Sequence, residues 1–288
     1  MDTSKILLTI IRIFIFFVHG MQEYFGIHVH GVGRALRLIR KPCEISVDGI
    51  RIYVEPSVAS SYHYMMIGKF NEPETHTFVN ALLQKTNVVT TVIDVGMNIG
   101  EMVLDFARHP SVSDVVGFEP NTRCVDSVWK SVALNGYTNI LVHTLALGRT
   151  VGTVPFHFSD SAVTSSAVLE RDGERTDVPA STLDQEFGNQ AAHAIIIIDV
   201  EGAELDVVAG GGSFIRRNRP LIIFEYHKVT RTVFALEDMR RELGNDYEIF
   251  RLRHDGGIDQ NLQETWNCVA VHTLSPWYKP CQSLIVHD

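Results

Sequence analysis

The 288-residue chain lacks the features that mark several classes of protein. Its four cysteines, Cys43, Cys124, Cys268 and Cys281, form no C-x-x-C pair, and zinc-type histidine spacing is absent. This pattern disfavours a disulfide scaffold or a zinc module and makes a reducing compartment the default expectation. No apolar run reaches the roughly 20 residues of a membrane-spanning helix.

Basic charge is also in short supply. Lys and Arg total 25 against 34 for Asp and Glu, a net charge of −9, so the chain lacks the electrostatic footprint of a nucleic-acid binder. With 45% apolar and 20% charged residues it is neither disordered nor collagen-like. Residues 1–41 contain six cationic and two acidic side chains, a net charge of +4, which leaves −13 for the remainder. Two physically different parts therefore meet near Pro42.

The first part contains a short apolar run, Ile6–Val18, which has Arg12 at its centre. A charge at the middle of a bilayer is costly, so a true membrane span is disfavoured. A cleaved secretory signal is disfavoured too, because no small-x-small cleavage site follows. Two interpretations stay open. One is an interfacial helix with Arg12 snorkelling and the basic cluster Arg34–Lys41 on anionic lipid; the other is a helix packed on the protein's own core. The protein is accordingly expected to be cytoplasmic or membrane-associated.

Residues 42–90 are predicted to form an elaboration that precedes the main domain, which spans residues 91–288. Alternating apolar residues in Glu44–Glu55 flank Asp48-Gly49, a strong hairpin signal. The segment Glu72–Lys85 is predicted to be a helix, because Pro73 and acidic residues stand near its start.

Strands and helices alternate from Thr91 onward. The uninterrupted apolar run Ile195–Asp199 predicts a central parallel strand that is buried on both faces. Further strands are predicted at residues 91–94, 114–119, 139–144, 152–158, 221–225, 247–253 and 265–272, and helices at 101–108, 121–135, 203–217 and 231–243, with a polar stretch at 159–176. This alternation predicts an α/β fold, a Rossmann-like, doubly wound and mostly parallel sheet with an antiparallel C-terminal edge pair.

Ligands of such sheets bind beyond the carboxyl ends of the strands, next to the first strand. There the turn after Asp94 contains Gly96 and Gly100, which allow close approach of the backbone to a ligand. Glu119 follows the next strand and can accept hydrogen bonds from both hydroxyls of a ribose. Together these features favour a bound nucleoside over a turn and a charged strand end without a ligand.

The turn also bears on which nucleoside is bound. A dinucleotide fingerprint needs a middle glycine, and here Met97 and Asn98 follow Gly96. This disfavours NAD and fits S-adenosylmethionine, which has no diphosphate and whose sulfonium suits acidic strand ends.

Several segments then occur in a recognisable order: VIDVGMNIG (92–100), GFEPN (117–121), LNGYTNI (134–140), ALG (146–148), STLD (181–184), IIDVEGAELDVVAGG (197–211) and RPLIIFEYH (219–227). In this order they resemble the FkbM family of S-adenosylmethionine-dependent methyltransferases, a class I methyltransferase type, over about residues 70–273. Met97 replaces the family's usual alanine, and Ile197 stands where the family often has lysine. Residues 1–41 lie outside the resemblance.

The resemblance implies S-adenosylmethionine as cofactor and methyl transfer, most often to a hydroxyl of a sugar, polyketide or other small metabolite. It assigns Gly96, Asn98 and Gly100 to the cofactor loop, with Asp94 at its start, and Glu119 to the ribose. Asn135 and Ala146–Leu147 match positions that would border the adenine and methionine parts of the cofactor. No nucleic-acid partner is implied.

A hydroxyl nucleophile benefits from a base that removes its proton. The candidates at the ends of the fourth and fifth strands are Asp199, Glu201, Glu225 and His227. Oxygen and imidazole groups of this kind could also hold a divalent cation, but nothing in their spacing demands a metal, and none is expected. Glu204 is interpreted as complementing a helix dipole.

Two other functions compete with methyl transfer. One is a nicotinamide-dependent oxidoreductase, against which the missing middle glycine counts. The other is a non-catalytic nucleoside-binding protein on the same fold, which the departures at Met97 and Ile197 keep open.

Overall fold

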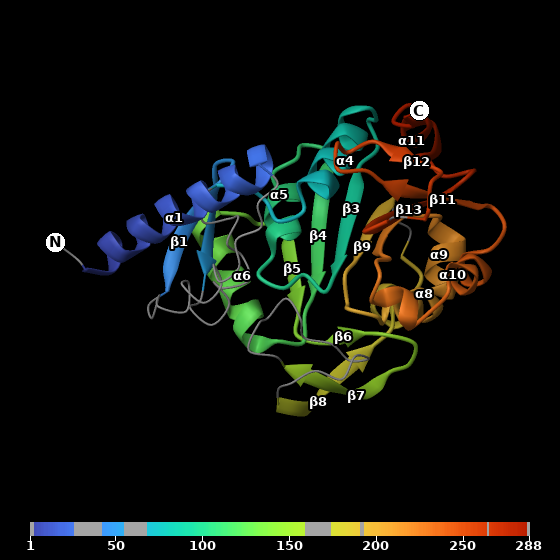
Figure 1. The fold of residues 1–288 in the computed structure, drawn as a ribbon. Coiled ribbons are helices and arrows are strands. Elements are labelled where there is room, and N and C mark those ends of the chain that lie inside the picture. The colour runs from blue at the N-terminus through green and yellow to red at the C-terminus, as the bar shows by residue number, and fades with distance from the viewer. Residues whose placement is uncertain are drawn as a thin grey trace.

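The computed structural model describes residues 3–25, 42–54, 68–158, 174–190, 193–263 and 265–286. Figure 1 shows a central sheet between two layers of helices, with helix α1 (Thr3–Phe25) at one end. The basic cluster Arg34–Lys41 lies outside the described residues.

The central sheet has eight strands in the order β12-β11-β13-β10-β9-β3-β4-β5. Their bounds are β3 Thr90–Val95, β4 Val112–Phe118, β5 Ile140–His143, β9 Ala194–Ile198, β10 Leu221–Glu225, β11 Tyr247–Leu252, β12 Ile258–Asp259 and β13 Asn267–His272. The strands from β10 to β5 run parallel, whereas β13 is antiparallel to both β10 and β11. The strand order therefore reverses at β3, and the predicted doubly wound sheet with antiparallel strands at its C-terminal edge is confirmed.

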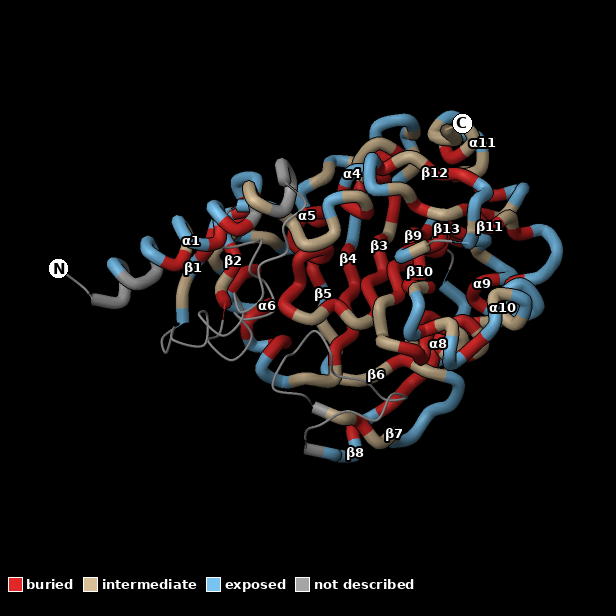
Figure 2. The backbone as a smooth tube through the Cα atoms, in the orientation of Figure 1, coloured by how far each residue is buried: buried red, intermediate tan, exposed pale blue. Residues whose placement is uncertain are grey.

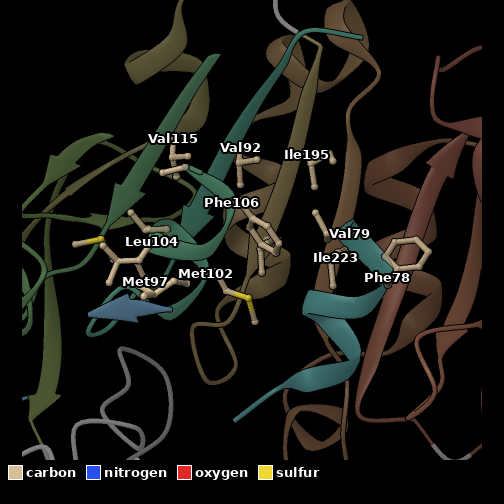
Figure 3. Packing of buried hydrophobic residues seen from close by; sticks show 14 of the residues in the cluster. Phe78, Val79, Val92, Met97, Met102, Leu104, Phe106, Val115, Ile195 and Ile223 are labelled. Carbon is tan, nitrogen blue, oxygen red and sulfur yellow. The ribbon is translucent and has the colours of Figure 1, made fainter. Parts of the chain in front are cut away.

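Two apolar cores cover the two faces of this sheet because successive side chains of a strand point to opposite sides. Ile195 and Ile197 belong to one core, and Ile196 and Ile198 to the other. The first core is covered by α4 (Pro73–Gln84), α5 (Glu101–Phe106) and α6 (Thr122–Asn135), and the second by α7 (Leu183–Phe187), α8 (Glu204–Ala209), α9 (Gly212–Asn218) and α10 (Leu236–Leu243). Figure 2 shows the buried central strands, and Figure 3 the close packing of α4 and α5 on the sheet.

Smaller elements flank the sheet. The predicted hairpin is formed by β1 (Cys43–Val47) and β2 (Ile50–Val54), and it packs against α6, where the Tyr53 N–H donates to Ser131 Oγ over 2.9 Å. A second sheet has the order β6-β8-β7, with bounds β6 Ala146–Leu147, β7 Gly152–Phe158 and β8 Glu174–Ser181. In the last described segment, α11 (Tyr278–Gln282) follows β13.

The described side chains of helix α1 that are buried lie on one face. Ile11, Ile15 and Val18 are buried in the same core as the hairpin, at the i, i+4, i+7 spacing of one helix face. Across the described part of the chain, no helix combines the length and apolar character needed to cross a membrane.

The structure corrects two predicted helices and adds a strand. The helix predicted at 203–217 is broken between α8 and α9, where the three consecutive glycines Gly210, Gly211 and Gly212 favour the helix poorly. A Cβ atom on Gly210 would lie 2.0 Å from the carbonyl oxygen of Gly148, so no side chain fits at this point. The helix predicted at 231–243 begins only at Leu236, after a 3₁₀ turn at Thr230–Thr232. The polar stretch predicted at 159–176 runs into β8, which pairs with β7.

Candidate functional site

The turn between β3 and α5 is built for close backbone contact. Gly96 and Gly100 have φ angles of +88° and +79°, and Asn98 between them has a φ of +50°. Glycine adopts this left-handed conformation without steric cost. A Cβ atom on Gly96 would lie 1.9 Å from the carbonyl oxygen of Asp199, so the turn touches the end of β9 with no room for a side chain.

Glu119 fastens this turn to the end of β4. Its Oε2 accepts a hydrogen bond from the Asn98 N–H over 3.1 Å, and its Oε1 accepts one from the Asn121 N–H over 2.8 Å. Burial raises the pKa of Glu119 to about 7, although both backbone hydrogen bonds favour the charged form. The glycine turn and the acid predicted to act together are therefore in contact.

Asp94 lies beside them on β3. Its side chain is buried, and among the described residues Oδ2 has no hydrogen-bond partner. Burial, followed by the charges of Glu72 and Glu119, raises the pKa of Asp94 to about 8. A buried acceptor without a partner is uncommon in proteins, and at this position it is suited to a donor group on a ligand.

The acids predicted as bases lie at the ends of the next two strands. Asp199 follows β9, and burial and then the charge of Glu225 raise its pKa well above its usual value. Oε1 of Glu225 is 3.6 Å from Nε2 of His227. Nδ1 of His227 lies 3.2 Å from Thr230 Oγ1. Glu201 stands in the turn after Asp199 with a left-handed φ of +53°. The structure thus brings Asp199, Glu225 and His227 together along one edge of the sheet.

Glu204 serves the start of α8. Its Oε1 accepts hydrogen bonds from the N–H groups of Gly202 and Val200 over 3.0 and 3.3 Å. Burial raises its pKa to about 7. These contacts agree with a role at the helix terminus.

The sequence analysis missed Glu72, which directly precedes α4, and His76, which lies in its first turns. Glu72 accepts a hydrogen bond from Asn267 Nδ2 over 2.9 Å, and its charge acts on both Asp94 and Asp199. His76 is buried, with Nδ1 2.5 Å from Asp105 Oδ2 and Nε2 3.2 Å from Glu101 Oε1.

His76 is charged at neutral pH. Burial opposes its charge, but the hydrogen bonds to Asp105 and Glu101 outweigh that effect and raise its pKa to about 9. In the sequence, Glu101 and Asp105 are four residues apart and so lie on the same face of α5. This spacing is the one signal that could have suggested a buried cation between them. The partner itself comes from a helix 25 residues or more earlier in the chain.

Asn135 is not brought to this site. It ends α6, which runs away from Glu119, and 13 residues of helix span about 20 Å. Its Nδ2 donates to the carbonyl of Arg51 and its Oδ1 accepts from the Arg51 N–H, so the side chain fastens the hairpin to α6. The assignment of Asn135 to the cofactor pocket is therefore corrected: Asn135 matches the motif but lies at the end of α6 that is far from Glu119.

The two departures from the family pattern lie in the core. Met97 and Ile197 are each 4% exposed and belong to the apolar core under α4 to α6. A Cβ atom on Gly117 would lie 2.3 Å from the Met97 sulfur, so Gly117 makes room for the larger side chain. Figure 3 shows Met97 among the packed residues of this core.

Carboxyl groups outnumber cations along this edge. The acids that act on one another are Glu72, Asp94, Glu101, Glu119, Asp199 and Glu225, with His76 as a buried cation among them. Such a site favours a ligand with positive charge and several hydrogen-bond donors. In the part of the chain that the structure describes, no three His, Cys, Asp or Glu residues are arranged to hold a metal ion.

Comparison with known proteins gives one family match. The model of the methyltransferase FkbM domain matches residues 94–252. No curated protein matches the chain.

Solved structures resemble the chain at low identity. Methyltransferase FkbM from Methylobacillus flagellatus KT is 16% identical, with 65% of this chain and 44% of that chain covered and a TM-score of 0.46. An rRNA methylase from Streptococcus thermophilus is 12% identical over 71% of this chain and 96% of that chain, with a TM-score of 0.40. A Pyrococcus abyssi tRNA (uracil-54, C5)-methyltransferase in complex with S-adenosyl-L-homocysteine is 12% identical over 80% and 44%, with a TM-score of 0.39. The match spans less than half of the Methylobacillus chain.

Proposed function

Because the chain belongs to the methyltransferase FkbM family, we propose that it transfers a methyl group from S-adenosylmethionine to a hydroxyl of a small molecule or glycan. The contact between the glycine turn and Glu119 carries this proposal. The Asn98 N–H of the turn donates to Oε2 of Glu119 over 3.1 Å, so the turn and the carboxylate expected to bind the ribose lie side by side. The lone acceptor Oδ2 of Asp94 beside them adds a place for a cationic donor.

The residues of the turn fit the groups that this cofactor presents. Each Glu119 oxygen accepts one backbone hydrogen bond and keeps a second lone pair, which suits a ribose hydroxyl. Asp94 would accept from the ammonium of the amino-acid end. Gly96 lets the turn pack directly against the Asp199 carbonyl, because no side chain fits there.

The chain's own task in the reaction is to hold the acceptor hydroxyl and take its proton. The bound cofactor supplies a methyl carbon made electrophilic by its sulfonium. Asp199 is the preferred proton acceptor, because it stands at the end of the central strand β9 beside the glycine turn, and because burial and then Glu225 raise its pKa and so its affinity for a proton. The ring nitrogens of His227 face Glu225 and Thr230, so we assign His227 and Glu225 to positioning.

Two measurements test this function. Calorimetric titration of the full chain with S-adenosylhomocysteine tests cofactor binding, and mass spectrometry of cell extract incubated with the protein and labelled cofactor tests transfer. Binding without transfer to any sugar, polyketide or lipid would support a non-catalytic binding protein instead.

We also propose that α1 rests on an anionic membrane surface. The side chains of Ile10, Ile13, Phe16 and Phe17 are 58–71% exposed, opposite the face that packs on the hairpin. Aromatic and aliphatic side chains on one face of a helix suit the boundary between lipid headgroups and acyl chains. The +4 net charge of residues 1–41 adds attraction to anionic lipid, which the −13 of the remainder would oppose.

A further inference from the structure

A cleft lies next to the end of β11, on the side of the sheet where the parallel strands have their carboxyl ends. It encloses about 300 Å³, which reaches the lower end of the range for ligand pockets. Its charged and aromatic lining residues are Glu74, Arg251, Arg253, His254, Asp255 and Trp266. None of them takes part in the cofactor cradle described above.

The cleft adjoins the acids of the proposed reaction. Trp266 lies 4.7 Å from the ring of His227, measured between ring centres, and its carbonyl accepts a hydrogen bond from the Tyr226 N–H. The next residue, Asn267, pairs with Glu225 across the sheet and donates to Glu72. Asp199 follows β9 and Trp266 precedes β13, and β10 lies between these two strands. The two residues are therefore two strand spacings apart, each about 4.8 Å. Across the sheet, the cleft and Asp199 are therefore about 10 Å apart, with Glu225 and Asn267 between them.

The cleft combines an aromatic surface with donors and acceptors. The Trp266 side chain is 53% exposed, a large apolar surface for a residue beside charged groups. Arginine and histidine offer N–H donors, while Glu74 and Asp255 offer carboxylate acceptors.

The charges of the cleft do not favour an anion. Arg251 and Arg253 form ion pairs with Asp259, and Arg253 Nε also lies 3.4 Å from Asp255. Carboxylates thus face the same space as the guanidinium groups and would repel an anion. A wholly apolar acceptor would desolvate these charged groups without replacing their hydrogen bonds to water, which is unfavourable. A ring with an apolar face and several hydroxyls satisfies both kinds of lining.

We propose that this cleft is the acceptor subsite and that it takes a sugar ring of a glycan, stacked on Trp266 and hydrogen-bonded by the arginine and carboxylate side chains. This inference rests on the proposed function, since it names the substrate class of the same site. A second hydroxyl-bearing unit, or another hydroxyl of the same ring, would reach Asp199.

Saturation-transfer NMR on the full chain tests the inference with a set of neutral methyl pyranosides, with methyl phosphate and n-octanol as anionic and apolar probes. We expect transfer to ring C–H protons of at least one pyranoside. Trp266→Ala and His254→Ala should each weaken that binding, the former about tenfold. Trp129→Ala is the matched control, because Trp129 is 44% exposed on α6, away from the cleft, and should bind as the parent does.

The outcomes separate the two proposals. S-adenosylhomocysteine binding with no pyranoside binding, or with methyl phosphate or octanol bound in the cleft instead, overturns the sugar subsite and leaves the proposed function standing. Pyranoside binding that Trp266→Ala weakens, without any binding of S-adenosylhomocysteine, supports the cleft as a sugar site but refutes the proposed methyl transfer. An equal loss in Trp266→Ala and Trp129→Ala also overturns the subsite.

Discussion

The backbone N–H of Asn98 donates a hydrogen bond to Oε2 of Glu119 over 3.1 Å, which joins the turn after β3 to the acid after β4. This bond and the one from the Asn121 N–H to Oε1 fix the Glu119 carboxylate against the glycine turn. The two parts of the proposed cradle are therefore joined directly, and a change in either should be felt by the other.

Replacing Gly96 with alanine should damage both fold and site. The φ of +88° and the 1.9 Å approach to the Asp199 carbonyl leave no room for a methyl group. Strain and overpacking together should lower the free energy of unfolding by about 3 kcal/mol or more, measured by urea denaturation. Gly136→Ala is the control, because Gly136 also has positive φ but open space around it, and it should cost about 1 to 2 kcal/mol. Equal losses would contradict the close contact.

The affinity for S-adenosylhomocysteine should rise with pH between about 6 and 8. Its ammonium needs Asp94 ionised, and the pKa of Asp94 is raised to about 8, so at pH 6 this carboxyl is largely neutral. Glu119, with a pKa raised to about 7, acts in the same direction. Calorimetry should show an increase of up to about tenfold per pH unit, levelling off above pH 8.

In Asp94→Asn, the affinity for S-adenosylhomocysteine should still rise with pH up to about 7, where Glu119 ionises, and should stay constant above that pH. Asp114→Asn, at the exposed start of β4, should keep the parent's profile. An affinity independent of pH in the parent would contradict the ionic role of Asp94.

Asp199→Asn should lower turnover far more than cofactor affinity. Loss of a general base costs about 10²- to 10⁴-fold in rate, whereas the amide keeps the shape of the side chain. Labelled-methyl incorporation and calorimetry give the two values. Asp206→Asn, which removes an acid paired with Arg149 on the surface of α8, is the control. Equal losses of rate and affinity would assign Asp199 a structural or cofactor role.

Phe16→Asp with Phe17→Asp should release the protein from vesicles of phosphatidylcholine and phosphatidylserine. These side chains are 71% and 62% exposed, so the fold should tolerate the change while the lipid contact is lost. Vesicle flotation should fall more than tenfold, since burying one such ring is worth about 1.5 to 3 kcal/mol. Val151→Asp with Leu274→Asp matches the charge change on exposed apolar residues elsewhere. A full chain that stays off vesicles and self-associates through α1 would indicate a second copy as the occupant.

The sheet could be predicted from the sequence because its signals are local. The all-apolar run Ile195–Ile198 identifies the buried central strand, and Asp48-Gly49 identifies the hairpin. The break between α8 and α9 could not be predicted in this way. At this break Gly210 packs against Gly148, a residue more than 60 positions earlier in the chain, and such a long-range contact leaves no local signal.

In the candidate site too, residues with a local signal could be predicted and residues placed by tertiary packing could not. The predictable ones follow strand ends or lie by the glycine turn, because the carboxyl ends of parallel strands share one edge of the sheet: Asp94, Glu119, Asp199 and Glu225. Glu72 and His76 come from an element outside that rule and reach the edge only through tertiary packing. Asn135 shows the opposite error, since a motif match says nothing of which end of a helix faces the ligand.

Calorimetric titration of the full chain with S-adenosylhomocysteine, compared with Glu119→Ala and Asp114→Ala, tests the central claim most directly. Asp114 lies near the start of β4 and Glu119 directly follows its end, and Glu119 is the acid that accepts a hydrogen bond from the glycine turn. We predict binding by the parent and by Asp114→Ala, and a loss of roughly 10- to 100-fold in Glu119→Ala, as expected for hydrogen bonds to a charged group. No binding by the folded parent, or equal binding by all three proteins, would contradict the account.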